Sequence, residues 1–537
     1  MSPVHLSRTR LLAMGALTAV GALVLSACSS TPSIPSARDL STDVSYTACS
    51  PSTCSGSLDG ASYKIEMPHK WNGTLLIYSH GYRNAQPAPP KFTPVETTAV
   101  DASDPATATL LLSQGYALAG SAYKSNGWAV SDGVAAAEGL YAHFRDAVAQ
   151  PKRTLVWGNS LGGLITQVLA EKHPEWVDGA APLCGAVAGV VPNMNLGLDI
   201  SYAVKTLVYP QMKLVGYASY QEAVENWTEA MKRLVAAASD TAGGGTAKVL
   251  YIASLVDAPI QTKTFDGSTV ESKVKATVEA IATGLGYATF ARYDLEQRFG
   301  GNPSGNENTD YSARISESEA ALIDAVTPGA VAANDALLAA GQRIAADPAA
   351  VAKARADGGD PKGTITRPEI TMHTAADPLV IAQNETFLQQ RYTAQVAKGN
   401  ATAGLVQLYT VAPATYPEVP GAPYGAGHCN FTPQSNVAVV DLLNDWVQKG
   451  IYPGDAAIEA AMAPAAGTWR RGGPGRGRVK IRCWDPERGS HRTGPGHPRG
   501  RARLEPGGRP RCRARESPPW RRARYRGGCC AGRPRRP

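Results

Sequence analysis

The amino-acid sequence predicts an α/β fold, with a mostly parallel sheet covered by helices on both faces and interrupted by a large helical insertion. In the first third of the chain, short apolar runs typical of strands buried on both faces alternate with helical patterns. The alternation stops between about residues 186 and 361, where long helical patterns dominate, and it resumes at residue 369. This rhythm favours parallel strands, because each crossover between parallel neighbours usually contains a helix.

The elements of the sheet are expected in the following order. Before the insertion we expect strands at 62–67, 74–78, 116–121, 154–157 and 177–183. Helices are expected between them at 106–114, 134–149 and 161–173. After the insertion we expect strands at 369–372 and 404–411 and helices at 381–398 and 437–449. Within the insertion, helical patterns lie at 220–237, 272–285 and 317–325, and we interpret the whole block as a cap or lid.

The N-terminal segment reads as a signal peptide over residues 1–27. Arg8 and Arg10 precede an apolar run at 11–25 that is too short to be a membrane-spanning helix. The following Leu25-Ser26-Ala27-Cys28 resembles the lipobox of bacterial lipoproteins, in which the cysteine is acylated. We therefore expect an extracellular lipoprotein anchored to the membrane at Cys28, with a Ser- and Pro-rich tether over residues 28–45. A plain secretory signal with an incidental Cys28 is the alternative.

The C-terminal segment, residues 466–537, has a different composition from the rest of the chain. Residues 470–537 contain about 22 Lys and Arg against 4 Asp and Glu, whereas the whole chain has a net charge of +8. The remainder is therefore acidic, at about −10, and the tail lacks the apolar periodicity that a core needs. A polybasic arm for anionic polymers is one interpretation. We favour a translated frameshift, and we expect no nucleic-acid partner because the protein is predicted to lie outside the cell.

About 425 residues remain between tether and tail, enough for one large domain with an insertion. We divide them into a first core segment at 46–185, the insertion at 186–361 and a second core segment at 362–465. Cys49 and Cys54 flank Pro51 and are expected to close a small loop by a disulfide, as extracellular conditions allow. No cysteine spacing resembles a structural zinc site, so we expect no metal.

The pentapeptide Gly158-Asn159-Ser160-Leu161-Gly162 lies between a predicted strand and a predicted helix. A G-x-S-x-G sequence in this position is typical of a nucleophile elbow, where a strained turn exposes the serine hydroxyl. A Cβ atom at either flanking glycine would crowd the neighbouring strand and helix. Ser160 is therefore the candidate nucleophile.

Acyl transfer also needs a base, an acid that orients it and donors for an oxyanion. Asp377 follows the predicted strand 369–372, at the strand end where such sheets hold their sites, although Asp-Pro also starts ordinary turns. His428 lies in a glycine-rich loop before the last predicted helix. The rival histidine His373 precedes Asp377 and is better explained as a strand-end or supporting residue. His173 is expected at the surface end of a helix.

His80-Gly81-Tyr82 follows the first long buried strand. We expect the backbone N–H groups of Tyr82 and Leu161 to form the oxyanion hole, where losing one donor typically costs about 3 kcal/mol of barrier. An ordinary strand-to-loop turn is the alternative. His80, Tyr123 and Trp128 are expected to line the substrate pocket, and its aromatic walls would suit an aromatic acyl group, although aromatic residues are also ordinary on surface loops.

With these motifs, residues 62–449 apart from the insertion resemble the α/β-hydrolases, whose chain order is Ser, Asp, His. Cys184 ends the strand after the elbow helix and Cys429 follows the candidate base, so both sulfurs are expected at the same sheet edge. A disulfide there would hold the His428 loop and contribute about 3–5 kcal/mol. It is similar in spirit to the disulfide of tannases and feruloyl esterases, but their first cysteine directly precedes the serine, where this chain has Asn159. Two free cysteines are the alternative.

The resemblance implies a serine hydrolase that cleaves carboxylic esters through an acyl-enzyme, without metal or organic cofactor. We expect a monomer acting on a small-molecule or polymer ester. One alternative is a tripeptidyl or prolyl aminopeptidase, whose cap carboxylates would hold the substrate's amino terminus, with Glu222 or Glu225 as candidates. The other is a non-catalytic surface binding protein on the same scaffold.

Overall fold

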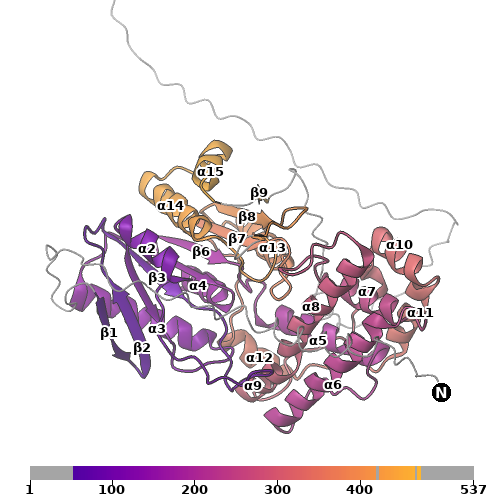
Figure 1. Ribbon diagram of the computed structural model, residues 1–537. Helices are drawn as coiled ribbons and strands as arrows, with labels where there is room; N and C mark the ends of the chain where they lie inside the picture. Colours follow the sequence, from indigo (N-terminus) through magenta and orange to yellow (C-terminus); the bar gives the residue numbers. More distant parts are fainter. Residues whose placement is uncertain (1–52, 419–422, 466–467, 473–537) are drawn as a thin grey trace, which may run out of the picture. The chain divides into compact units, whose positions relative to one another are not determined.

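The computed structural model describes residues 53–418, 423–465 and 468–472 (Figure 1). The predicted signal peptide, Cys28, Cys49 and most of the predicted tail lie outside these residues. The described part contains a nine-stranded sheet in the order β1-β2-β4-β3-β5-β6-β7-β8-β9. Its strands are β1 Thr53–Leu58, β2 Ala61–Glu66, β3 Thr74–Ser79, β4 Ala117–Ser121, β5 Arg153–Asn159, β6 Gly179–Leu183, β7 Glu369–Thr374, β8 Leu405–Val411 and β9 Thr468–Arg471. Strands β3 to β8 run parallel, whereas β1, β2 and β9 pair antiparallel with their neighbours.

Helices cover both faces of the sheet, because its central strands are apolar on both sides. All six residues of β3 are buried. Leu75 and Ile77 pack with α3 Val130–His143 and α4 Leu161–Lys172, whereas Leu76 and Tyr78 pack with helices on the opposite face. The helices of that opposite face are α2 Pro105–Ser113, α14 Pro433–Lys449 and α15 Asp455–Met462. Alternate strand residues therefore serve two separate apolar layers, as a sheet buried on both faces requires.

Two further helical segments complete the core. The π-helical turn Phe144–Val148 extends α3, and α13 Gln383–Lys398 connects β7 to β8. The crossovers β3-α2-β4, β5-α4-β6 and β7-α13-β8 each return to a parallel neighbour of the strand that they leave. The sheet therefore holds the carboxyl ends of β5, β7 and β8 on one side, where the following loops meet.

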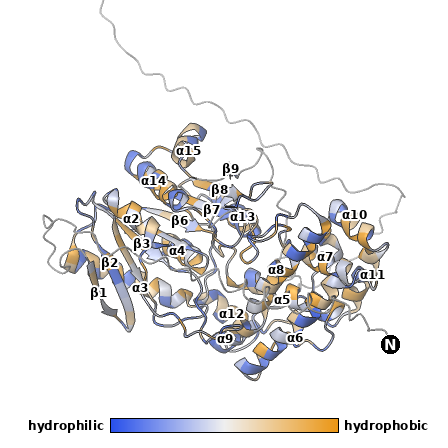
Figure 2. Ribbon diagram, viewed as in Figure 1, coloured by the Kyte–Doolittle hydropathy of each residue, from blue (hydrophilic) through white to orange (hydrophobic). Residues whose placement is uncertain are grey.

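The cap lies between β6 and β7, a fully described stretch whose helices are joined by loops and which contains no strand. Its helices are α5 Val190–Leu207, α6 Tyr220–Ser239, α7 Gly245–Leu255, α8 Val270–Ala288, α9 Phe290–Phe299, α10 Glu317–Val326, α11 Ala330–Ala340 and α12 Pro348–Asp357, with a short 3₁₀ turn at Ser312–Arg314. They bury an apolar cluster of their own, which includes Trp227, Leu234 and Tyr251. Figure 2 shows both hydrophilic and hydrophobic turns on α6, as expected for an amphipathic helix over this core.

All seven predicted strands are present, within a few residues of their expected bounds. Strands β1 and β9 were not expected. Strand β9 lies in the range predicted as a tail, so that boundary was drawn too early for these residues. Its residues Thr468–Arg471 form a short edge strand whose main-chain pairing with β8 does not depend on an apolar pattern.

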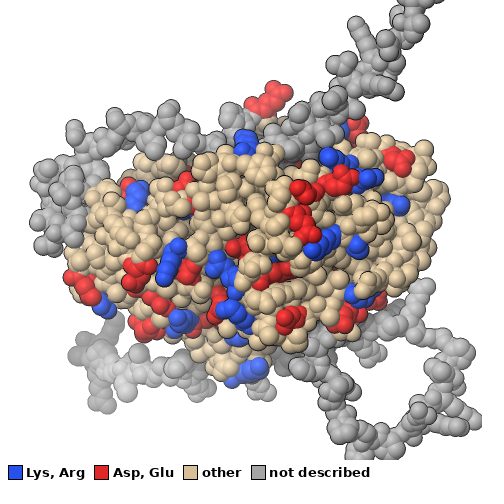
Figure 3. All heavy atoms as spheres, turned by 90° about the horizontal axis from the view of Figure 1, so that it is seen from below, with Lys and Arg blue, Asp and Glu red and all other residues tan. Residues whose placement is uncertain are grey.

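Within residues 53–418, 423–465 and 468–472, no single helix has the length and apolar composition needed to cross a membrane. Helices α10 and α11 meet that requirement only as a pair, bent by 106°. On the face seen in Figure 3, acidic and basic side chains of the described residues are interspersed.

Candidate active site

Ser160 lies in a tight turn between β5 and α4, with φ 62° and ψ −122°. A positive φ is uncommon for a residue with a side chain, and the close approach of the neighbouring backbone stabilises it here. A Cβ on Gly162 would lie 1.9 Å from the carbonyl oxygen of Ser79, and a Cβ on Gly158 would lie 2.4 Å from the same atom. The expectation that side chains at both flanking positions would crowd the turn is therefore confirmed.

Ser160, His428 and Asp377 lie in one chain of hydrogen bonds. Ser160 Oγ is 2.7 Å from His428 Nε2, and His428 Nδ1 is 2.8 Å from Asp377 Oδ2. Since a carboxylate oxygen accepts, Nδ1 carries a proton and leaves Nε2 free to accept from the serine hydroxyl. The structure thus brings together the three residues that the sequence suggested, in the order nucleophile, base and acid.

The carboxylate of Asp377 is buried, and both of its oxygens accept hydrogen bonds. Its Oδ1 accepts from the backbone N–H groups of Leu379 and Val380, at 2.9 and 3.0 Å. Oδ1 therefore stabilises the turn that Asp-Pro sequences favour, while Oδ2 accepts from His428. Burial alone would raise the pKa of Asp377, but His428, His373 and the backbone N–H groups outweigh it and hold the pKa below its usual value.

The loops that carry Asp377 and His428 are joined by main-chain pairing. Ala376 and Ala426 form a parallel β-bridge, and the N–H of Gly427 donates to the carbonyl of Ala376 at 2.9 Å. The hydroxyl of Thr374 donates to the carbonyl of Gly427, also at 2.9 Å. Gly427 has a φ of +92°, which a residue with a side chain rarely adopts. This pairing fixes the acid and the imidazole relative to each other.

A disulfide between Cys184 and Cys429 lies directly beside this site. Its sulfur at Cys429 is 3.4 Å from His428 Nε2. Cys184 follows Leu183, whose carbonyl accepts from the N–H of Ser160 at 2.9 Å. The predicted bridge is therefore present, and it joins the His428 loop to the strand end that holds the elbow. Cys54 is also disulfide-bonded, and its predicted partner Cys49 lies outside the described residues.

Cys184, Cys429 and His428 bring three potential metal ligands within 4.8 Å of one another. Both sulfurs are bonded to each other, so neither offers the thiolate that metal ions bind. The cluster is better explained as the covalent brace of the histidine loop.

The predicted oxyanion donors lie on either side of the elbow. Leu161 is the first residue of α4, and a Cβ on Gly81 would lie 3.1 Å from the Cβ of Ser160. The loop containing Tyr82 therefore lies against Ser160. Among the described residues, neither the N–H of Tyr82 nor that of Leu161 donates to a protein acceptor, so both are available to a ligand.

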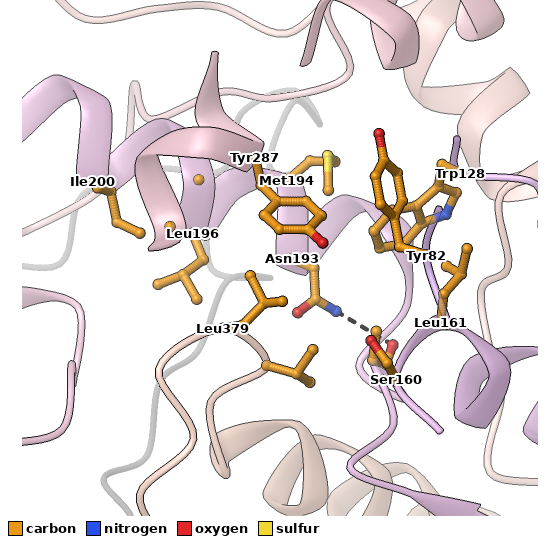
Figure 4. Close-up of a pocket in the computed structure, with 14 residues that line it drawn as sticks. Tyr82, Trp128, Ser160, Leu161, Asn193, Met194, Leu196, Ile200, Tyr287 and Leu379 are labelled. Atoms are coloured by element: carbon orange, nitrogen blue, oxygen red, sulfur yellow. Dashed lines mark hydrogen bonds between the residues drawn. The ribbon is translucent and has the colours of Figure 1, made fainter. Parts of the chain in front are cut away.

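A cavity extends from Ser160 between the elbow and the cap, and the empty space along it, with its open mouth, is about 530 Å³ (Figure 4). Its lining comprises Tyr82, Trp128, Ser160, Leu161, Ala186, Asn193, Met194, Leu196, Gly197, Ile200, Gly284, Tyr287, Leu379 and Val380. Trp128 is in the wall, as predicted. None of these residues is Asp, Glu, Lys or Arg.

His80 and Tyr123 do not line the cavity, contrary to expectation. Their rings stack on each other with centroids 3.9 Å apart, and the Tyr123 hydroxyl donates to the carbonyl of His80 at 3.0 Å. Burial lowers the pKa of His80 to about 4. Both side chains are buried against the loop that carries Tyr82 and do not reach the cavity.

Sequence reasoning missed one buried partner of the site, Glu385. His373 is fully buried in β7, where its Nε2 donates to the carbonyl of Val380 at 2.7 Å and its Nδ1 is 3.3 Å from Glu385 Oε1. Burial alone would lower the pKa of His373, but Glu385 and Asp377 raise it above its usual value. The hydroxyl of Thr371 and the amide of Gln407 also donate to Glu385. His373 is thus a supporting residue, as the sequence suggested.

The remaining candidate residues lie elsewhere. His173 ends α4 and pairs with Glu138 at 2.6 Å. Glu222 forms an ion pair with Lys213 at 2.9 Å, and Glu225 accepts from Gln221. Neither of these cap carboxylates lines the cavity.

The strand order, the elbow after β5, and the acid and histidine loops after β7 and β8 define the α/β-hydrolase fold, and this chain has that fold. No family model matches the chain, and no curated protein matches its sequence. Similar solved structures include an esterase from Aspergillus oryzae, at 14% identity over 73% of this chain and 78% of that chain, with a TM-score of 0.33. Feruloyl esterase B from the same organism is 15% identical over 75% of this chain and 80% of that chain, with a TM-score of 0.33. Candida antarctica lipase A is 13% identical over 74% of this chain and 75% of that chain, with a TM-score of 0.30.

Proposed function

We propose that this chain is an extracellular serine hydrolase that cleaves carboxylic esters. The observation that carries the proposal is the hydrogen-bond chain from Ser160 through His428 to Asp377, with distances of 2.7 and 2.8 Å. A nucleophile, a base and an orienting acid in this arrangement are what acyl transfer requires. No metal or organic cofactor has a part in this chemistry.

In the proposed reaction, Ser160 Oγ attacks the ester carbonyl while His428 Nε2 takes its proton. The N–H groups of Tyr82 and Leu161 stabilise the oxyanion, and Asp377 stabilises the imidazolium. His428 then gives the proton to the leaving alcohol, which departs and leaves an acyl group on Ser160. Water, activated by the same imidazole, hydrolyses this acyl-enzyme.

The chemistry of the cavity favours an ester over a peptide with a free amino terminus. An ammonium group needs a carboxylate partner when it leaves water. The cavity lining contains no Asp or Glu, and Glu222 and Glu225 have other partners. This composition supports an uncharged acyl group and disfavours the aminopeptidase alternative.

The test of the proposal is the replacement Ser160→Ala. We expect kcat/KM on p-nitrophenyl butyrate to fall by about 10⁴- to 10⁶-fold, since removal of a triad nucleophile has that effect. Labelling by a fluorophosphonate should be lost with it. The matched control is Ser113→Ala, because Ser113 is exposed on α2 and its hydroxyl bonds only its own helix. Retained hydrolysis in Ser160→Ala would exclude Ser160 as the nucleophile, whereas a wild-type protein that hydrolyses no ester would favour a non-catalytic binding protein.

The proposed location is the outer face of the membrane, with a lipid anchor at Cys28. The disulfide between Cys184 and Cys429 supports an oxidising compartment. We expect the wild-type protein in the membrane fraction of the cell and Cys28→Ser in the soluble fraction, since loss of the acyl chains removes the anchor. Equal distribution of the two proteins would contradict the anchor.

A further inference from the structure

The cavity at Ser160 has a definite direction along the cap. In Figure 4, Ser160, Leu161 and Trp128 lie toward one side of the labelled residues, and Leu196 and Ile200 lie toward the other. Asn193, Gly197 and Ile200 follow one another along the same face of α5, at a spacing of four and three residues. On the opposite side the wall comes from α8, through Gly284 and Tyr287.

The cavity lies on the acyl side of the scissile bond. His428 must give its proton to the leaving group, so the leaving group has to lie beside His428 Nε2. The cavity is lined by Tyr82 and Leu161, whose N–H groups are the proposed oxyanion donors, whereas neither His428 nor Asp377 is part of its wall. A substrate with its carbonyl oxygen between the two N–H groups therefore directs its acyl chain into the cavity.

The walls offer an acyl chain almost no hydrogen bonds. The amide of Asn193 is already bonded to Gly189 at 2.9 Å and to Asn384 at 3.0 Å. Burial raises the pKa of Tyr82 well above its usual value, so its phenol stays neutral. Tyr287 carries the other phenol of the wall, and the remaining lining is aliphatic or aromatic apart from Ser160 itself. Such a surface favours an apolar chain and disfavours a charged or hydroxylated one.

The far end of the cavity is set by a close approach of α5 and α8. A Cβ on Gly284 would lie 2.5 Å from Ile200 Cδ1, so only glycine leaves this contact open. From Asn193 to Ile200 the helix advances about 10 Å, at about 1.5 Å per residue. An extended chain advances about 1.25 Å per carbon, from a bond of about 1.5 Å and an angle of about 111°. The cavity thus has room for about eight carbons.

We propose that the cavity binds an unbranched saturated acyl chain of about eight carbons that ends against Ile200 and Gly284. This inference rests on the proposed function and names its substrate class. The structure thereby assigns chain-length selection to two cap residues that lie outside the catalytic machinery.

The experiment compares p-nitrophenyl esters from acetate to laurate. With the wild-type protein, kcat/KM should rise about fourfold per methylene, the factor for burying one CH₂, up to octanoate and then fall. Ile200→Ala should move the optimum to longer chains, and Gly284→Val should move it to shorter ones. Val204→Ala is the matched control, since Val204 is buried on the same helix but does not line the cavity. Its chain-length profile should equal that of the wild type.

Three outcomes would overturn the inference while leaving an ester hydrolase. The first is a kcat/KM that does not change with acyl length, and the second is a higher kcat/KM on p-nitrophenyl benzoate or cinnamate than on the octanoate. The third is a kcat/KM that, among acetate esters, depends on the length of the alcohol. An unchanged optimum in both Ile200→Ala and Gly284→Val would also overturn it. Failure of the proposed function is distinguishable, because no ester of any length would then be hydrolysed and a fluorophosphonate would not label Ser160.

Discussion

His80 is a neutral histidine held behind the loop that faces Ser160. Its Nδ1 donates to the carbonyl of Gly81 at 2.7 Å, and its ring stacks on Tyr123. Burial, and to a smaller degree the nearby charge of Arg83, lower its pKa from 6.5 to about 4. The loop that carries Gly81 and Tyr82 therefore begins at an imidazole that the folded protein protonates only in acid.

This histidine makes the protein less stable in acid. Between pH 6.5 and 4 the unfolded chain binds a proton at His80 that the folded chain does not, so stability falls as the pH decreases. The loss is about 3 kcal/mol over this range, at about 1.4 kcal/mol per pKa unit. Thermal midpoints measured from pH 7 to pH 4 should fall more steeply for the wild type than for His80→Gln. If the midpoints of the two proteins fell equally with pH, His80 would have the same pKa in the folded and the unfolded chain.

Single residues also differ in whether the sequence could predict their place in the candidate site. Ser160, Asp377 and His428 were recognisable because each has local features, an elbow, an Asp-Pro turn and a glycine-rich loop. Glu385 has no such feature, since a glutamate in the first turn of a helix is ordinary. Only the packing of α13 against β7 brings it to His373, and that contact is not local in the sequence.

At the level of elements, one covalent link joins two chain segments at the edge of the sheet where Ser160 lies. The Cys184–Cys429 disulfide connects the end of β6 to the loop before α14, across a separation of 245 residues. Leu183, next to Cys184, holds the N–H of Ser160. The disulfide thus affects the positions of Ser160 and His428 together.

We expect the double variant Cys184→Ser/Cys429→Ser to lose both stability and activity. Opening a loop of this length should lower the free energy of unfolding by about 3–5 kcal/mol. The His428 loop then becomes less fixed, so kcat should fall even at temperatures where the variant is folded. Thermal unfolding and kcat on one ester measure the two effects. A variant with normal kcat below its unfolding transition would limit the disulfide to stability.

The strands differ in how well the sequence predicted them, for a physical reason. Central strands such as β3 are buried on both faces and must be apolar throughout. Edge strand β1, with the sequence TCSGSL, is mostly exposed and has no apolar pattern. Its pairing with β2 depends on main-chain hydrogen bonds, which nearly any sequence can form.

In the whole molecule, too, local sequence patterns predict only part of the structure, and they predict least in the cap. The sequence predicted a helical block, but α5 is buried on most of its sides and so lacks a clear amphipathic period. Gly197 and Gly284, from two helices distant in the chain, form part of the cavity wall. The shape of the cavity therefore depends on packing between helices, which composition and periodicity do not predict.

The boundary between the folded body and the basic tail lies after β9, farther along the chain than the sequence predicted. Strand β9 pairs with β8 through Trp469 and Thr410 among others, and Trp469 packs on the apolar layer beneath it. Arg471 donates to the hydroxyl of Tyr452 at 2.6 Å. The segment 468–472 is thus integrated into the sheet, although its composition is that of the tail.

Two shortened chains separate the contributions of strand and tail. A chain ending at residue 472 loses the basic segment but keeps β9, so we expect it to retain the thermal midpoint and esterase activity of the full chain. A chain ending at residue 465 also loses β9, which exposes the edge of β8 and removes the contacts of Trp469. We expect its midpoint to fall by about 2–4 °C for each kcal/mol lost, with more aggregation through the open edge. Equal midpoints for the two chains would mean that β9 adds nothing to stability, and lost activity in the longer one would give the tail a functional role.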